Sequence, residues 1–351
     1  MKRDTKDAQK KLITNVNEKK AAESEIDSAI FGITLQNQPI NTIFRVNSKR
    51  NSKKKPMHKL EIQYGAIRAV TTAPKLDAAA AQMFDYLLYV YANTPNHDNN
   101  DTVVITLSDY MRDFKKIDRR SARRAIKNNL DALFNTYYEY YGGYKDDKYN
   151  PQWRGYIHLL NYAYNRRGTF IVKWDSDFYN HFLVNHAMPM PHHQYSFTLN
   201  PYKEATSLYI LRALEENKRK NAGNPSRQNW IKVSTLLKNI SSLKPAEQLR
   251  AEDNRHYYER IIEPIYKAVE RLATPRDKDR PLKSYCFTSG SGKNKKLLEL
   301  GDKNVDYNLF INANLEVEWN NYPDNLLKQW NKTKISKNKK KNKNNQKSKT
   351  K

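Results

Sequence analysis

The amino-acid sequence is short of cysteine and of long apolar runs, and both shortages restrict what the chain can be. Its single cysteine, Cys286, excludes an intrachain disulfide framework and any zinc site built from several cysteines. Cys286 stands in the strand-like pattern Ser-Tyr-Cys-Phe-Thr, which predicts a buried structural thiol. No stretch approaches the ~18 consecutive apolar residues of a membrane-spanning helix, and no apolar signal core follows the opening Met-Lys-Arg-Asp. We therefore expect a reduced, cytoplasmic protein with no membrane partner.

Acidic residues are also scarce in comparison with basic ones. The 351 residues contain 63 Lys and Arg against 37 Asp and Glu, which gives a formal net charge of +26. Residues 332–351 contribute ten lysines and no acid, so part of this charge belongs to a tail or to an ordinary solvated surface. The remainder is still strongly basic. Such an excess attracts polyanions over long range, and nucleic acid is the commonest polyanion in a cell.

Two stretches about 126 residues apart predict the same order of structural elements. Each reads as a helix, a short strand, a Ser-capped helix, a longer basic helix and a hairpin. The first stretch places these elements at 76–92, 103–106, 108–116, 118–135 and 156–174, and the second at 202–217, 230–233, 234–240, 253–272 and 284–300. Almost no residue identities survive between them. The order is that of a winged helix-turn-helix, whose third helix suits the major groove of DNA.

The predicted fold is therefore α+β, mainly α, with two tandem winged helix-turn-helix domains. The length is sufficient for two cores of ordinary size. We expect a mostly disordered basic arm at 1–58 with an apolar island at 30–43, a first domain at 59–185, a linker at 186–200, a second domain at 201–322 and a disordered Lys/Asn-rich tail at 323–351. Ser108 and Ser234 are the predicted caps of the second helix in each domain.

The basic helix of the first stretch has one apolar and one polar face. Its apolar residues follow helical spacing: Ala122, Ile126, Leu130, Leu133 and Phe134. The opposite face carries Arg120, Arg124, Lys127 and Asn128. Arginine can read guanine with two hydrogen bonds and asparagine can read adenine, whereas lysine more often contacts phosphate. An ordinary amphipathic helix with a solvated basic face fits the same pattern, but its place in a repeated winged-helix order favours a recognition helix.

The hairpin that follows predicts a basic wing. Alternating residues from Tyr156 to Tyr164 lead to a turn at 165–168 and a return strand from Thr169 to Trp174. Arg166 and Arg167 stand at the turn, where they can touch phosphate or enter a minor groove. Arginines at a solvent-exposed turn are also common, so the position alone leaves both interpretations open.

The long helix of the second stretch has a basic edge that acidic residues border. The edge consists of His256, Arg260, Lys267 and Arg271, and the neighbouring acids are Glu259, Glu263 and Glu270. These glutamates lower the positive potential and can pair with the basic residues within the helix. Pro264 predicts a kink or a late helix start, because it removes one backbone hydrogen bond.

Catalytic chemistry finds little support in the residues. Rolling-circle nicking enzymes hold a metal with two histidines around one apolar residue, whereas His192 and His193 are adjacent and, like His186, lie in the predicted linker. The segment 289–293 looks like a phosphate loop but lacks its first glycine and its final Ser or Thr, which predicts a hairpin turn. We expect no catalytic residue, no metal site and no cofactor.

The second long helix resembles the plasmid replication initiators of the iteron-binding type. That family often shows an aromatic residue, a basic residue, two aliphatic residues and a proline here, and this chain has Tyr258, Arg260, Ile261, Ile262 and Pro264. It departs from the pattern at Ile265, where the family usually has Ala, and at Ala268, where the family has Glu. The resemblance covers about residues 60 to 320.

The resemblance implies two winged-helix domains that bind repeated origin sequences in double-stranded DNA and initiate replication. It also implies that the protein can repress its own gene as a homodimer, and that the second long helix gives the stronger base readout. A host helicase or primase is a further candidate partner. The alternatives are a transcriptional repressor, a tyrosine-dependent origin nickase and a structural nucleoid protein. A structural nucleoid protein is disfavoured, because coating DNA does not require two wings and ordered helices.

Deleting residues 332–351 tests the role of the basic tail. If its ten lysines add nonspecific phosphate contacts, the deletion should reduce the slope of log affinity against log salt and leave the preferred DNA sequence unchanged. Binding titrations at several salt concentrations measure both. An unchanged slope would assign the tail to solubility alone.

Overall fold

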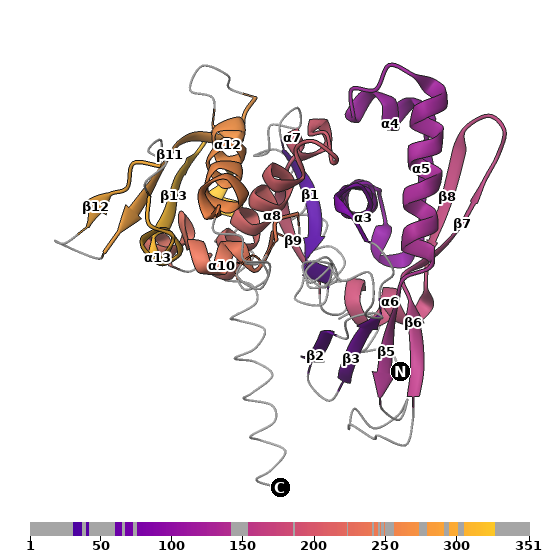
Figure 1. The fold of residues 1–351 in the computed structure, drawn as a ribbon. Coiled ribbons are helices and arrows are strands. Elements are labelled where there is room, and N and C mark those ends of the chain that lie inside the picture. The colour runs from indigo at the N-terminus through magenta and orange to yellow at the C-terminus, as the bar shows by residue number, and fades with distance from the viewer. Residues whose placement is uncertain are drawn as a thin grey trace, which may run out of the picture.

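The computed structural model describes most of the chain from residue 31 to residue 326. The described residues are 31–36, 40–41, 60–64, 67–72, 76–141, 154–184, 187–222, 224–240, 242–244, 246, 249, 256–273, 279–290, 295–300 and 305–326. Within them the fold is α+β, with two winged-helix units side by side (Figure 1). Most of the predicted basic arm and the tail from residue 327 lie outside the described residues.

The first unit has the predicted order of a winged helix. Its elements are α3 (Ala78–Asn93), a 3-10 turn (His97–Asn99), β4 (Thr102–Thr106), α4 (Leu107–Asp113), α5 (Arg119–Phe134), β7 (Leu160–Tyr164) and β8 (Thr169–Trp174). The three strands form an antiparallel sheet in the order β4-β8-β7. A short helix α6 (Ser176–Phe178) and a π-helical segment η3 (Tyr179–Val184) close the unit.

Local capping explains where the two central helices begin. The Asp118 carboxylate accepts hydrogen bonds from the backbone N–H groups of Arg120 and Ser121, and this cap starts α5 at the predicted place. The cap of α4 is Thr106, whose hydroxyl accepts from the N–H of Asp109 at 3.1 Å. The prediction of Ser108 as the cap was wrong, because the helix begins directly after β4 without an intervening turn.

The run predicted as one strand from Tyr156 to Tyr164 is two strands in two sheets. It breaks at Leu159: β6 (Arg154–His158) pairs with β5 (Tyr137–Tyr141), and β7 pairs with β8. Leu159 and Leu160 are both fully buried, which no single strand with one buried face allows. The second sheet has the order β2-β3-β5-β6, with β2 at Leu60–Tyr64 and β3 at Ile67–Thr72.

The second unit repeats the winged helix with an insertion in its wing. Its elements are α8 (Ala205–Lys220), α9 (Pro225–Gln228), β10 (Trp230–Lys232), α10 (Val233–Leu237), η4 (Tyr258–Ile262), α12 (Glu263–Leu272), β11 (Leu282–Ser289), β12 (Lys296–Leu297), α13 (Tyr307–Asn312) and β13 (Asn314–Trp319). The sheet order is β10-β13-β11-β12. The strand that returns beside β10 is therefore β13, whereas the predicted wing at 284–300 ended with the short strand β12.

Two local predictions for the second unit have different outcomes. Pro264 lies in the first turn of α12, and the π-helical turn η4 leads into this helix without a break, so the α-helical part begins late but the helical segment itself does not. Ser234 is not a cap: α10 starts at Val233, and Lys232 occupies the cap position without a side-chain hydrogen bond.

The segment predicted as a linker is a buried strand and a short helix. Residues Met188–His193 form β9, which pairs antiparallel with β1 (Phe31–Gln36), and α7 (Tyr195–Thr198) follows. The linker prediction for 186–200 was wrong there because Pro189 and Pro191 favour a loop. In a two-stranded sheet each strand has an outer edge, where proline needs no hydrogen-bond donor. The outer domain boundaries themselves stay predictions.

The hydrophobic core centres on the first helix of each unit. In α3, Met83, Leu87 and Leu88 are fully buried, and the helix packs against α5. In the second unit α8 packs against α12, and α3 and α8 also contact each other. Among the described residues, no helix combines the length and the apolar character needed to cross a bilayer.

Truncating the buried face of α5 should destabilise the first unit, and truncating its exposed face should not. Ile126 is fully buried, so Ile126→Ala should lower the free energy of unfolding by about 2–5 kcal/mol. Asn128→Ala, two residues further on the exposed face, is the matched control and should stay within about 0.5 kcal/mol of the native value. Urea unfolding followed by circular dichroism measures both. Equal losses would contradict the assignment of the two faces.

Candidate nucleic-acid interface

The polar face of α5 is open to solvent along its length. The predicted residues Arg120, Arg124, Lys127 and Asn128 are all exposed. Within the described part of the chain, none of these three basic side chains makes an ion pair. The opposite face is buried through Ala122, Ile126, Leu130 and Leu133. The helix thus presents positive charges that form no ion pair with a carboxylate of the described residues.

The tip of the first wing lies against the same helix. The Arg123 guanidinium donates to the backbone oxygen of Arg166 at 2.6 Å, and that of Arg119 to the backbone oxygen of Arg167 at 3.4 Å. These bonds hold the turn by its carbonyl groups, while the side chains of Arg166 and Arg167 stay exposed. The structure therefore brings the two predicted wing arginines beside the predicted recognition helix.

Arg119 and Arg123 are contributors that the sequence interpretation missed. Both lie on α5, four residues apart, but on the side that faces the wing. Their partners are backbone oxygens, which leave no signal in the residue pattern. Their helical spacing is the one feature that pointed to a shared role.

A glycine is required at the end of the wing turn. Gly168 has φ +96°, and a Cβ atom there would lie 3.0 Å from the Cβ of Leu107 and 3.4 Å from the Arg123 guanidinium. Its carbonyl accepts from the N–H of Leu107 at 2.8 Å. This close approach joins the wing tip to the start of α4 and so fixes the wing relative to both helices.

Aromatic side chains line a shallow groove of about 310 Å³ beside the C-terminal half of α5. Phe134 and Tyr164 are 42% and 50% exposed. The Lys127 ammonium lies 5.8 Å from the centre of the Tyr164 ring, and the Tyr162 hydroxyl donates to Asp131. Burial, with the Asp131 carboxylate, raises the pKa of Tyr162 well above its usual value, so this hydroxyl keeps its proton.

The basic edge of the second unit is largely paired with carboxylates. Lys267 lies 2.6 Å from Glu263, and Arg271 lies 2.7 Å from Glu204 at the start of α8. His256 lies 3.8 Å from Glu259. Arg260 is exposed and makes no ion pair with another described residue. Of the glutamates beside this edge, Glu259 and Glu263 pair with basic residues of the edge itself.

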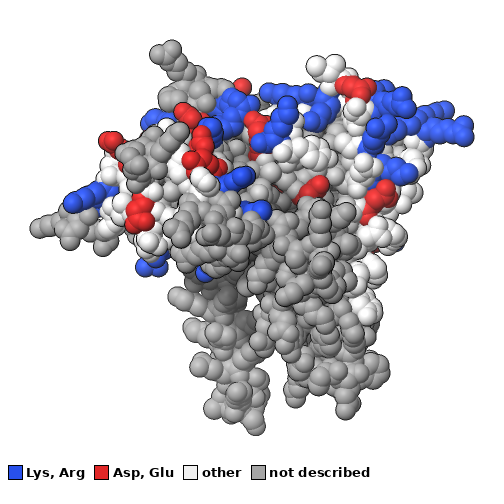
Figure 2. All heavy atoms as spheres, viewed as in Figure 1, with Lys and Arg blue, Asp and Glu red and all other residues white. Residues whose placement is uncertain are grey.

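The distribution of charge over the surface reflects this difference. Figure 2 shows Lys and Arg gathered over the end of the β7–β8 hairpin, and Asp and Glu interspersed with basic residues over the region of α12. The hydrogen bond with Glu263 raises the pKa of the Lys267 ammonium above its usual value, so this residue stays charged while paired. The two units therefore offer different electrostatic surfaces.

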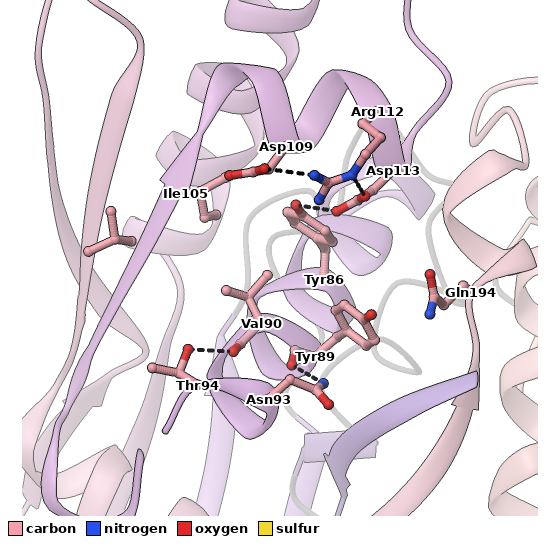
Figure 3. A pocket seen from close by; sticks show the side chains of 11 residues that line it. Tyr86, Tyr89, Val90, Asn93, Thr94, Ile105, Asp109, Arg112, Asp113 and Gln194 are labelled. Atoms are coloured by element: carbon pink, nitrogen blue, oxygen red, sulfur yellow. Dashed lines mark hydrogen bonds and ion pairs between the residues drawn. The ribbon is translucent and has the colours of Figure 1, made fainter. Parts of the chain in front are cut away.

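A larger groove of about 400 Å³ separates α3 from α4 and β4 (Figure 3). Arg112 contacts Asp113 at 2.9 Å and Asp109 at 3.0 Å, and the Tyr86 hydroxyl donates to Asp113 at 2.9 Å. Burial, then Asp113, raises the pKa of Tyr86 far above its usual value. The charged groups of this groove satisfy one another and leave no excess positive charge for a phosphate.

The histidines considered as metal ligands serve the interior instead. His192 contacts Glu215 through Nδ1 and Ser196 through Nε2, both at 2.8 Å, and His193 Nδ1 accepts from the N–H of Tyr195 at 3.1 Å. Each histidine is 1% exposed, and His186 lies outside the described residues. In the part of the chain that is described, no group of three or more His, Cys, Asp and Glu could hold a metal ion.

Two smaller predictions concern β11. Cys286 lies on this strand and is half-buried, whereas the sequence predicted a buried structural thiol; partial burial raises the pKa of this thiol. Ser289 pairs with Lys296 across β11 and β12, so the glycine-rich segment between them connects a hairpin, as the sequence predicts. Residues 291–294 themselves lie outside the described residues.

These features define a tandem winged helix-turn-helix protein with an exposed basic helix and wing in its first unit. Residues 67–186 match the model of the family described as Initiator Replication protein, WH1. The matched segment contains α3, α4, α5 and the wing and covers about a third of the chain. The match supports the resemblance to iteron-type replication initiators.

Two solved structures align with most of the chain. Both are crystal structures of domains 2 and 3 of RctB. The first, a selenomethionine derivative, is 12% identical and covers 80% of this chain and 98% of its own, with a TM-score of 0.41. The second is 13% identical and covers 79% of this chain and 96% of its own, with a TM-score of 0.37. No curated protein matches the sequence significantly.

The two buried histidines should give the stability a defined pH dependence. Burial disfavours protonation of His192, but Glu215 outweighs it and raises the pKa of His192 above 6.5. Burial, then the neighbouring His192, lowers the pKa of His193 to about 3. The stabilisation from His192 is therefore fully present below pH 6.5 and is lost as the pH rises through its raised pKa, whereas His193 destabilises the fold as the pH falls below 6.5.

Substituting each histidine separately tests the direction of these two pH dependences. Above pH 6.5 the native chain loses about 1.4 kcal/mol of unfolding free energy for each unit by which the pKa of His192 is raised. His192→Gln should reduce this loss. His193→Gln should leave that alkaline limb intact and reduce the loss between pH 6.5 and about 3. Urea unfolding across pH 4 to 9 measures both limbs. An unchanged alkaline limb in His192→Gln would contradict the assignment.

Proposed function

We propose that this replication initiator binds repeated origin sites in double-stranded DNA and reads them with α5 and the first wing. The observation that carries the proposal is the exposed basic face of α5, whose Arg120, Arg124 and Lys127 pair with no described carboxylate, with the wing arginines held beside it. An α-helix fits the major groove of B-DNA, which is about 12 Å wide. The wing then lies over the adjacent backbone or minor groove.

The residues of this surface suit different parts of the DNA, either base edges or phosphates. Arg120 and Arg124 suit the two acceptors of guanine, and Asn128 suits the donor and acceptor pair of adenine. Lys127 and the wing arginines Arg166 and Arg167 suit phosphate oxygens, which fix the register of the helix in the groove. None of the three basic residues on α5 has to break an ion pair with a described residue before it contacts DNA.

The second unit contributes a weaker surface. Arg260 is the residue of its basic edge that can contact DNA without first giving up a carboxylate. His256, Lys267 and Arg271 pair with glutamates, and exchanging these for phosphate reduces the net gain. The family resemblance favours base readout by the second long helix. We therefore propose Arg260 as the leading contact there.

Initiation needs no catalytic residue on this proposal. Binding at several repeats bends the DNA. The bend strains the adjacent AT-rich base steps, and these open because their base pairs separate most readily. A homodimer that covers the same sites near its own gene would block transcription, which accounts for autoregulation. A host helicase or primase would then load on the opened strands.

Removing single basic residues tests the interface. With a DNA duplex recovered from a random-sequence pool by the native chain, Arg124→Ala should weaken binding by about 1–3 kcal/mol and relax the preference at one base pair. Lys127→Ala should weaken binding to all sequences and reduce the salt slope by about one. Arg112→Ala is the matched control, because Arg112 is an exposed arginine of α4 that pairs with Asp109 and Asp113.

The outcomes separate the proposal from its alternatives. Binding without sequence preference, or equal losses for Arg124→Ala and Arg112→Ala, would overturn it. A repressor would bind the same sites without supporting replication of an origin plasmid when the protein is supplied. A nickase would convert supercoiled origin DNA with Mg²⁺ into a product joined to a tyrosine through a 5′-phosphate, which the proposal excludes.

A further inference from the structure

The two winged-helix units are joined by a buried ion pair between their first helices. On α8, Arg212 donates from Nε to Asp85 Oδ2 at 2.6 Å and from a terminal nitrogen to Asp85 Oδ1 at 2.9 Å. The side chains of Arg212 and of Asp85, on α3, are 10% and 4% exposed. Two parallel hydrogen bonds between a guanidinium and a carboxylate fix the relative direction of the groups as well as their distance.

A second contact holds the chain where it passes between the units. Gln82 lies one turn before Asp85 on α3, and its amide nitrogen donates to the backbone oxygens of Ser196 at 2.6 Å and Leu199 at 2.9 Å. Gln82 is 2% exposed. These bonds attach the α7 segment, which leads into the second unit, directly to the first unit.

A third contact attaches the second unit to the β1–β9 pair. Glu215, three residues after Arg212 on α8, contacts His192 through one carboxylate oxygen and accepts from the N–H of His193 at 2.9 Å through the other. The Tyr322 hydroxyl, which follows β13, donates to the backbone oxygen of Pro191 at 3.2 Å. The segment predicted as a linker is thus held from both sides.

The supporting helices transmit these contacts to the two candidate recognition helices. Helix α3 packs against α5 and α8 packs against α12. Figure 1 shows α3 and α8 between α5 and α12. Apolar packing alone lets helices slide or rotate. Paired buried polar groups oppose such movement, because the movement would separate the partners and leave them without hydrogen bonds.

We infer that Gln82, Asp85, Arg212 and Glu215 are positioning residues that hold α5 and α12 at one fixed separation. The two units then engage DNA as a single rigid reader with a set spacing between their contact regions. The statement about DNA rests on the proposed function, and the statement about rigidity does not. The protein should therefore prefer a duplex in which the two contacted regions lie at one fixed distance along the helix axis and at one fixed angle around it.

A distance measurement on the full chain tests the rigidity without DNA. Spin labels at Ser121→Cys on α5 and Glu270→Cys on α12, in a Cys286→Ser background, place one label on each candidate recognition helix at exposed positions. Pulsed electron paramagnetic resonance should give a single narrow distance distribution. A broad or multiple distribution in the otherwise native chain would overturn the inference whatever the protein binds.

The positioning variant replaces the polar contacts by apolar side chains of similar size. Gln82→Leu, Asp85→Leu and Arg212→Met together keep the interface filled, because apolar replacement of a whole buried pair is tolerated better than removal of one partner. The distribution should broaden. Lys220→Ala is the matched control: it removes a 2.6 Å ion pair with Glu216 within α8 and should leave the distribution narrow. An equally narrow distribution in the triple variant would also overturn the inference.

DNA spacing provides the second readout. Inserting two base pairs between the two footprints of the duplex selected by the native chain separates them by about 7 Å more and rotates them by about 70°. The native chain and Lys220→Ala should lose at least about tenfold in affinity, equivalent to 1.4 kcal/mol. The triple variant should lose less than about threefold. Equal losses in all three proteins would refute the positioning role.

The two readouts keep this inference separate from the proposed function. If the native chain binds no duplex with sequence preference, the proposed function fails, and the distance distributions alone decide the rigidity. If the native chain binds specifically and tolerates the insertion, the positioning inference fails while the proposed function stands.

Discussion

The arrangement of this protein depends on the ion pair between Asp85 and Arg212. Both side chains are nearly excluded from solvent, so removing one of them would leave the other charge poorly compensated. The pair joins α3 to α8, and these helices support α5 and α12. The positions of the two candidate reading surfaces relative to each other therefore rest on one buried electrostatic contact, reinforced by Gln82 and Glu215.

The two units differ in how their basic residues are matched, although their folds repeat. The α5 surface carries cations without carboxylate partners among the described residues, while α12 holds Lys267 and Arg271 in ion pairs. A free cation gains more from phosphate than a paired one, because no existing attraction is lost. The first unit is thus the stronger electrostatic surface. The second is the weaker one, since three of its basic residues pair with glutamates.

Sequence reasoning succeeded where the determinants are local. The ends of α5 follow from Asp118 and Asn135, and the exposed face follows from helical spacing. It failed where partners are distant in the chain. The strand β9 depends on β1, more than 150 residues earlier, and the second wing closes with β13 only after α13 intervenes. The break at Leu159 requires knowledge of two sheets, and the pairing of His192 with Glu215 requires the packed interface. For the candidate site, the pattern identified the exposed basic residues but not Arg119 and Arg123, whose partners are backbone oxygens.

The contact between α3 and α8 has a consequence for which units can associate through this face. Asp85 and Arg212 are each the eighth residue of their helix, so equivalent positions of the two copies meet. In a symmetric dimer of identical units, a residue on the two-fold axis faces itself, and this position would set like charges against each other. In this chain a carboxylate faces a guanidinium at this position. The opposite charges therefore favour contact between the two units of one chain over contact between two like units through this face.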